Sequence, residues 1–154
     1  MPKPARHKAV EPVVGAYILD SKDRLLMVKG YKWGDQWLIP GGHIELGESV
    51  FDTAVREAKE EVGLTVRPLG IVTVFEDIFP KDFHDKKRHF LYFELFCRAR
   101  GTKVRIDGDE VSEFRWFTLR EALRASTNPT VSSTISTYIK WRKAGRYQFI
   151  KLRP

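Results

Sequence analysis

The chain has 154 residues, of which 42% are hydrophobic and 31% are charged. This composition is typical of a soluble globular protein, and the length suits one domain with its own core. The single cysteine, Cys97, excludes an internal disulfide, and no apolar run approaches the roughly 18 residues that a membrane-spanning helix needs. Residues 1–8 lack the apolar stretch of a signal peptide, so we expect a cytoplasmic protein without membrane contact.

The positive charge of the chain is concentrated at its two ends. The formal net charge is +7, with +2 in residues 1–12 and +6 in residues 138–154, which leaves −1 for the part between them. Basic ends of this kind are more often solvated than specific for a partner. We therefore expect basic tails at residues 1–9 and 146–154 around one domain of residues 10–145, and we do not expect a nucleic-acid partner.

The first part of the chain predicts a hairpin followed by a loop. Residues 13–19 and 24–29 are rich enough in apolar side chains to form two strands, and the polar residues between them form a turn. In the loop that follows, Tyr31 and Trp33 could stack on a nucleobase or simply pack the loop. A short strand at residues 36–40 then brings the chain to a pair of glycines.

A glycine-rich loop at Gly41 and Gly42 leads into the most informative helix of the sequence. Residues 49–62 contain no Gly or Pro, and Gly63 is placed to end the helix in a left-handed conformation. One face carries an apolar residue at every fourth position, and the carboxylates lie on an adjacent arc. The apolar positions are Val50, Ala54, Ala58 and Val62, and the carboxylates are Glu57, Glu60 and Glu61. Carboxylates this close repel one another, so a hard divalent cation, Mg²⁺ above all, is the expected counter-charge.

The rest of the chain alternates strands and helices, and we find no repeat and no second domain. We expect strands at residues 69–75, 90–98 and 114–117, a short strand within 101–108, and a polar loop at 81–89. A capping box at Thr118 and Glu121 opens a helix that continues to residue 125. Gly145 ends a last helix that begins at residue 131.

The segment from Gly42 to Leu64 resembles the Nudix box, the signature of the Nudix hydrolase superfamily of MutT-like proteins. It fits the pattern G-x5-E-x7-R-E-U-x-E-E-x-G-U, in which U is apolar. The matching residues are Gly42, Glu48, Arg56, Glu57, Ala58, Glu60, Glu61, Gly63 and Leu64. Ala58 is smaller than the residue that usually stands at its position. The resemblance implies an α/β protein with the Nudix fold, an α/β/α sandwich around a mixed β-sheet.

The resemblance also implies a magnesium site in this loop and helix. Glu57 and Glu61 would be the principal metal ligands, and Glu60 a further ligand. The carbonyl group of Gly41 would be a backbone ligand. Mn²⁺ could take the place of Mg²⁺ as the cofactor.

Further residues would complete the catalytic centre. Arg56 and Glu48 would hold the carboxylates in place by ion pairing. Attack of water on a diphosphate needs a free carboxylate that accepts the proton, and either Glu60 or Glu110 could do this. Glu110 belongs to a second acidic cluster, for which a solvated loop is the alternative interpretation. Arg88 could bind the phosphates or a sugar of the substrate.

Members of this family hydrolyse a nucleoside diphosphate that is linked to another group. The leading hypothesis is a Mg²⁺-dependent pyrophosphohydrolase of nucleoside triphosphates or related nucleoside diphosphate compounds, with attack of water at phosphorus. The first alternative is an ADP-ribose or nucleotide-sugar pyrophosphatase, because Pro80 lies 16 residues beyond Leu64, as in the ADP-ribose pyrophosphatase subgroup. The second is a non-catalytic Nudix module that senses nucleotides or binds RNA. A homodimer is an expectation from the family alone.

Overall fold

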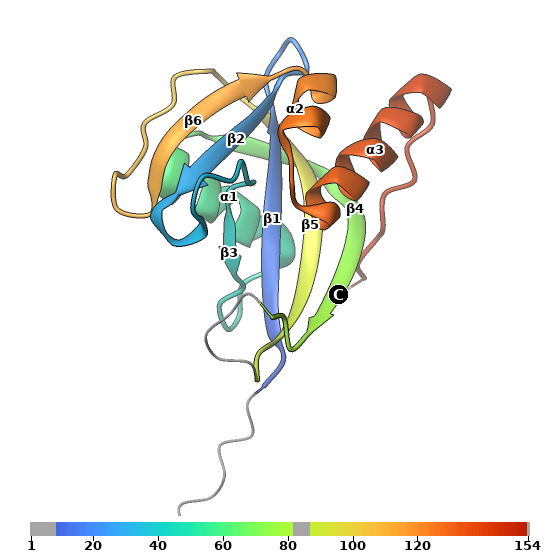
Figure 1. The fold of residues 1–154 in the computed structure, drawn as a ribbon. Helices are drawn as coiled ribbons and strands as arrows, with labels where there is room; N and C mark the ends of the chain where they lie inside the picture. The colour runs from blue at the N-terminus through green and yellow to red at the C-terminus, as the bar shows by residue number, and fades with distance from the viewer. Residues whose placement is uncertain (1–8, 82–86, 154) are drawn as a thin grey trace, which may run out of the picture.

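The structure is a computed structural model that describes residues 9–81 and 87–153, and this part contains six strands and three α-helices (Figure 1). In chain order these elements, with one 3-10 helix, are β1 (Glu11–Leu19), β2 (Leu25–Gly30), η1 (Tyr31–Trp33), β3 (Gly41–His43), α1 (Val50–Val62), β4 (Val66–Ile78), β5 (His89–Ala99), β6 (Val111–Phe117), α2 (Leu119–Ala125) and α3 (Pro129–Ala144). Most of the expected N-terminal tail, and residues 82–86 of the expected polar loop, lie outside the described residues.

The strands form one mixed sheet in the order β4-β5-β1-β2-β6. β1 and β5 are parallel along the whole of β1, and the other strand pairs are antiparallel. The second edge of β1 is shared between two strands. β2 pairs with β1 at Leu19, whereas β3 pairs with it from Val13 to Gly15. β2 therefore diverges from β1, as Figure 1 shows, and leaves a gap between the two strands.

The segment that precedes β3 enters this gap. Leu38 exchanges two backbone hydrogen bonds with Val28 of β2, at 2.9 and 2.8 Å, and the Ala16 N–H of β1 donates to the Pro40 carbonyl at 2.8 Å. The prediction of a strand at residues 36–40 is wrong, because only Leu38 makes a bridge there and the strand forms at β3, where a loop was expected. Pro40 has no N–H to continue a ladder, and the glycines after it let the backbone approach β1.

Two hydrophobic layers cover the two faces of the sheet. Side chains alternate along β1, so that Val14, Ala16 and Ile18 join the core beneath α1, whereas Tyr17 and Leu19 join the core beneath α2 and α3. In Figure 1, α1 lies behind the sheet and the other two helices lie in front of it. The expected α/β/α sandwich around a mixed sheet is confirmed.

The connection between β5 and β6 differs from the prediction. The short strand expected within residues 101–108 is not formed, although the whole segment is described. Instead the segment passes the end of α1, where the Arg105 N–H donates to the Val62 carbonyl at 2.9 Å. One hydrogen bond to a helix end replaces the expected strand pairing.

The C-terminal residues 146–153 run back along β4. The Ile150 N–H donates to the Ile71 carbonyl at 2.8 Å and forms an isolated bridge with the strand. The Phe149 ring fills the space above Gly70, where a Cβ atom would lie 2.4 Å from Phe149 Cγ. The segment therefore covers part of an edge strand of the sheet.

The two glycines of β3 leave no room for a side chain. A Cβ atom on Gly41 would lie 2.0 Å from the Val14 carbonyl oxygen, and a Cβ atom on Gly42 would lie 2.2 Å from Glu57 Oε1. Real Cβ atoms do not approach other atoms this closely. These glycines therefore allow β3 to lie against both β1 and the carboxylates of α1.

We expect Gly41→Ala to lower the free energy of unfolding by about 1–3 kcal/mol, the usual cost of overpacking. The new methyl group would meet the backbone carbonyl of Val14, which belongs to a buried strand and cannot rotate away. Urea unfolding of the metal-free protein measures the change. Gly101→Ala is the matched control, because nothing lies within 4 Å of a Cβ atom there. Equal losses in the two variants would contradict the close approach of β3 to β1.

Glu94 of β5 is a carboxylate buried on the sheet face that carries α2 and α3. Its side chain is 5% exposed, and this burial raises its pKa to about 7. It lies opposite Gly15 of β1, and a Cβ atom on that glycine would lie 2.3 Å from Glu94 Oε2. The glycine thus makes room for the carboxyl group, and the core favours its neutral form.

A raised pKa in the folded state predicts how stability depends on pH. The contribution of Glu94 is fully present below the ordinary carboxyl pKa of 4.5 and is lost as the pH rises through about 7. Glu94→Gln has no charge to bury, so its free energy of unfolding relative to wild type should rise by up to about 3 kcal/mol between about pH 5 and 8. Urea unfolding at each pH tests this, and a constant difference between the two proteins would refute it.

Candidate active site

Helix α1 presents its carboxylates at the boundary of the core. Ser49 caps its first turn, and Gly63 ends it in the left-handed conformation at φ 69°. The expected apolar face is buried; its members are Val50, Ala54, Ala58 and Val62. Glu57 and Glu61 flank this face and are each only 8% exposed, whereas the side chain of Glu60 is 60% exposed.

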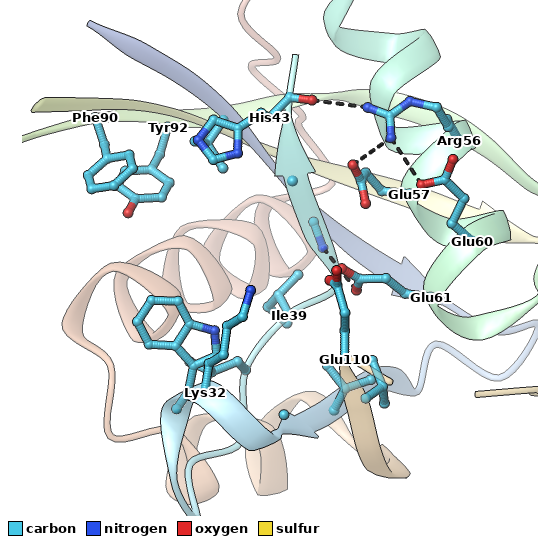
Figure 2. Close-up of a pocket in the computed structure, with 18 of the residues that line it drawn as sticks. Lys32, Ile39, His43, Arg56, Glu57, Glu60, Glu61, Phe90, Tyr92 and Glu110 are labelled. Carbon is cyan, nitrogen blue, oxygen red and sulfur yellow. Dashed lines mark hydrogen bonds and ion pairs between the residues drawn. The ribbon is translucent and has the colours of Figure 1, made fainter. Parts of the chain in front are cut away.

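Arg56 connects the carboxylates of this helix with the loop before it (Figure 2). Its Nε and Nη2 groups donate to the two carboxylate oxygens of Glu48 at 2.8 and 3.1 Å, and Nη2 also donates to the His43 carbonyl at 3.0 Å. Its Nη1 group donates to Glu57 at 2.7 Å and to Glu60 at 3.1 Å. The Arg56 guanidinium holds the pKa of Glu48 at about 2. The ion pairs of Arg56 and Glu48 are thus present.

Glu61 has no cationic partner among the described residues, whereas Glu57 shares Arg56 with Glu48 and Glu60. Burial, followed by the neighbouring charge of Glu57, raises the pKa of Glu61 to about 8, and the charges of Glu110 and Asp107 add to this. Burial also raises the pKa of Glu57. The Gly41 N–H donates to Glu61 Oε2 at 3.3 Å, which offsets only part of the repulsion. Crowded carboxylate oxygens that outnumber the positive charges beside them fit a hard divalent cation.

The side chains of Glu57, Glu60 and Glu61 are not arranged around a common point at which a metal ion could bind. Within residues 9–81 and 87–153, no three acidic, histidine or cysteine side chains are gathered in a way that could hold a metal ion. Glu57 and Glu60 both turn toward Arg56, as Figure 2 shows. A cation would therefore compete with Arg56 for these two groups.

The carboxylates form one wall of a cavity of about 1020 Å³. It opens where β2 diverges from β1, and Val13, Val28 and Leu38 line it from the diverging strands and the inserted segment. The candidate site residues that line it are Trp33, Gly41, Arg56, Glu57, Glu60, Glu61, Arg88 and Glu110. Residues that are distant in the sequence thus meet at one cavity.

The candidate substrate-binding residues differ in their positions. Trp33 and Arg88 line the cavity, and Arg88 donates through Nε to Glu11 at 2.9 Å and lies 4.6 Å from the centre of the Phe90 ring. Tyr31 is not part of the lining, and it is 68% exposed. Successive residues of a 3-10 helix are about 120° apart, so Tyr31 and Trp33 cannot face the same way.

Glu110 reaches the cavity from the end of the loop before β6. Asp107 shapes this loop by accepting hydrogen bonds from the N–H groups of the three residues after Gly108, including that of Glu110 at 3.2 Å. In Figure 2 the side chain of Glu110 points toward Glu61. The second acidic cluster of the sequence is therefore brought to the carboxylates of α1 through Glu110.

Sequence reasoning missed several residues that line the cavity. Phe90 and Tyr92 lie on one face of β5, with ring centres 5.6 Å apart, and His43 points to the same side in Figure 2. His43 Nε2 lies 2.8 Å from a carboxylate oxygen of Glu11. The alternation of aromatic residues at positions 90 and 92 was a usable signal for a shared face. The position of Lys32, on another side of the cavity, carried no such signal.

Comparison with known proteins decides the family. The family model described as the NUDIX domain matches residues 10–138, which is most of the chain. The chain belongs to the Nudix family. Membership confirms the resemblance that the box from Gly42 to Leu64 suggested, and with it the assignment to the Nudix hydrolases.

Two curated relatives illustrate the range of this Nudix protein's similarities. It is 26% identical to the asymmetrical bis(5'-nucleosyl)-tetraphosphatase of Mus musculus over 99 residues, which cover 64% of this chain and 67% of that protein. It is 26% identical to the ADP-ribose pyrophosphatase of Methanocaldococcus jannaschii over 136 residues, which cover 88% of this chain and 76% of that protein. Four other matched relatives are longer, and the chain covers 20–44% of them.

A solved structure supports the fold of this Nudix protein. The Ap4A hydrolase of C. elegans superposes with a TM-score of 0.72 at 17% identity, and the match covers 88% of this chain and 99% of that one. At this identity the similarity concerns the fold alone. Among the described residues of the present chain, no helix is long and apolar enough to span a membrane.

The fork of hydrogen bonds made by Arg56 predicts that Lys cannot replace it. Arg56→Lys keeps the charge but cannot bind Glu48, Glu57 and the His43 carbonyl together. We expect the free energy of unfolding to fall by about 1–3 kcal/mol, because charged groups that are largely buried lose hydrogen bonds. Urea unfolding without metal measures this. Arg67→Lys, at an exposed position of β4, is the control and should have no effect. Similar values for the two variants would show that the fork does not stabilise the site.

Proposed function

We propose that this Nudix hydrolase is a Mg²⁺-dependent pyrophosphohydrolase of nucleoside triphosphates or related nucleoside diphosphate compounds. The observation that carries the proposal is the pair of buried carboxylates, Glu57 and Glu61, at the wall of the cavity. Arg56 offsets the charge of Glu57 but makes no hydrogen bond to Glu61, so a further positive charge would stabilise the pair. Glu57 and Glu61 would then serve to bind a cation that contacts the diphosphate of the substrate.

The residues that would hold the cation are those of the box. Glu57 and Glu61 are the principal ligands, Glu60 is a further ligand, and the Gly41 carbonyl is a backbone ligand. When bound, Mg²⁺ or Mn²⁺ supplies positive charge that offsets the charge of the diphosphate and makes water more acidic. Arg56 keeps Glu57 and Glu60 next to the cavity through the hydrogen bonds described above.

We assign removal of the proton from the attacking water to Glu110 rather than Glu60. Glu60 already accepts a hydrogen bond from Arg56 at 3.1 Å, so its carboxylate is directed toward Arg56. Glu110 lines the cavity and points toward Glu61. It comes from another element than the ligands, so it can approach the water from a different side.

The remaining walls of the cavity suit a nucleotide. Trp33 and Tyr92 offer aromatic surfaces on which a base can stack, and Lys32 supplies positive charge for phosphates beside Arg88, which is paired with Glu11. Tyr31 would bind only at the rim, because it is not part of the lining. Aromatic surface and positive charge therefore lie next to each other in the cavity.

A second candidate keeps the chemistry and changes the substrate. The cavity of about 1020 Å³ has room for a group on each side of a diphosphate, as in ADP-ribose, a nucleotide sugar or a dinucleoside polyphosphate. The names of the mouse and Methanocaldococcus jannaschii relatives agree with such substrates. A non-catalytic sensing or RNA-binding module is less well supported, because all three box carboxylates are present. A cytoplasmic location and a homodimer stay predictions.

A hydrolysis screen with identified products tests the proposal. Wild-type protein and Glu61→Gln are compared in Mg²⁺ on nucleoside triphosphates, ADP-ribose, nucleotide sugars and dinucleoside polyphosphates. We expect Glu61→Gln to lower kcat/KM by roughly 100-fold or more, because several kcal/mol of charge stabilisation are lost. Glu113→Gln, on β6 and outside the cavity lining, is the matched control and should keep full activity.

The products separate the candidates. A nucleoside monophosphate with pyrophosphate supports the triphosphatase. A nucleoside monophosphate with a sugar phosphate, or two nucleotides from a dinucleoside polyphosphate, supports the second candidate. ¹⁸O from labelled water should appear in a phosphate product, because water attacks phosphorus. Nucleotide binding without any turnover would overturn the proposal in favour of the sensing module.

A further inference from the structure

A second cavity lies at the other end of the sheet. It has a volume of about 560 Å³ and is formed by the turn between β1 and β2, the start of α2 and the last turns of α3. Figure 1 shows these elements at the top of the molecule and β3 in its lower half. Leu19, at this end of β1, is separated from Val13 of the first cavity by about 20 Å along the strand.

The lining of this second cavity is strongly basic. Lys22, Arg120, Arg142 and Lys143 line it together with a single carboxylate, that of Asp23. The charge of Asp23 is already neutralised from two sides, because Arg98 lies 2.8 Å and Arg142 lies 3.3 Å from its carboxylate oxygens. For Lys22, Arg120 and Lys143, we find no ion pair with any residue in the described part of the chain.

Interactions with the helix dipoles account for only some of the cations in this cavity. Arg142 and Lys143 stand in the last turn of α3, where cations interact favourably with the helix dipole. Arg120 stands in the first turn of α2, where a cation opposes the dipole. Lys22 lies on an exposed turn and gains nothing from a helix. Like charges that share a cavity repel, so an anion between them would stabilise all of them.

The elements that carry these cations are held firmly together. Asp20 is 1% exposed and accepts hydrogen bonds from the N–H groups of Lys22 and Arg24, both at 2.9 Å, which fixes the turn. Asp23 then joins this turn to β5 through Arg98 and to α3 through Arg142. The cations therefore come from a fixed frame and need no folding of a loop to meet a ligand.

We propose that this cavity is a second binding site, and that it takes phosphate groups of a polyanion. It is larger than one phosphate, and its three cations that make no ion pair within the described residues suit several negative charges in a row. The phosphates belong either to a nucleic-acid strand or to a free polyphosphate chain. The site lies far from the carboxylates of α1, so it goes beyond the proposed hydrolysis and does not depend on it.

The test compares two double variants with equal loss of charge. Arg120→Gln with Lys143→Gln removes two cations from the cavity, whereas Arg67→Gln with Lys103→Gln removes two exposed cations elsewhere. The probe is a fluorescent single-stranded oligonucleotide of about 12 nucleotides, a length that several cations can contact. Anisotropy is measured without divalent cation, so the probe is not hydrolysed.

We expect the cavity variant to bind the probe at least roughly tenfold more weakly at low salt. The slope of log Kd against log salt should fall by about 1.4, since each contact with a single-strand phosphate contributes about 0.7. The control variant should bind like wild type. Lys22→Gln, a single exposed change in the turn, should weaken binding in the same direction and guards against misfolding of the double variant. Hydrolysis of small nucleotides should be unchanged in all variants.

Competition identifies the source of the phosphates. If inorganic tripolyphosphate displaces the probe at equal phosphate concentration, the ligand is a free polyphosphate. If it does not, the ligand is a nucleic-acid strand. Equal weakening in the two double variants, or no binding by wild type, overturns the proposal. Because hydrolysis is measured separately, failure of this site and failure of the proposed activity are distinguishable.

Discussion

The divergence of β2 from β1 is the constraint on which the rest of the structure depends. The two strands share one pair at Leu19 and then separate, so the backbone around Leu38 and Pro40 satisfies the hydrogen bonds that the strands no longer give each other. The inserted chain continues into β3, and its glycines touch both β1 and α1. The opening that results is the cavity, and α1 forms one wall of it. The geometry of the sheet thus creates the site.

The carboxylates of α1 differ in their electrostatic surroundings. Arg56 binds Glu48, Glu57 and Glu60 and so ties the helix to the loop before it. Within residues 9–81 and 87–153 Glu61 has no cationic partner, and burial destabilises its charged form and raises its pKa. A site of this kind stores unfavourable energy that a cation can release on binding. Helix α1 therefore stabilises the fold through Arg56, and it also holds a buried carboxylate, Glu61, that lowers stability when no cation is bound.

The parts of the site that are local in sequence could be predicted. The spacing of residues in one helix determines that Glu57 and Glu61 share an arc and that Gly63 ends the helix, and the structure agrees. The place of β3 could not be predicted, because it depends on the loss of pairing between two other strands. The contribution of Phe90 and Tyr92 likewise depends on the pairing of β5 with β1, which no local pattern specifies.

The C-terminal segment has a consequence for the integrity of the protein. β4 is an edge strand, and an uncovered edge can pair with a strand of another molecule and start aggregation. Ile150 pairs with the backbone of Ile71, and the Phe149 ring covers Gly70. A protease that cut the chain after α3 would remove this cover and leave the carboxylates of α1 untouched. Such a cleaved protein would keep the cavity beside α1 but lose its protection against self-association.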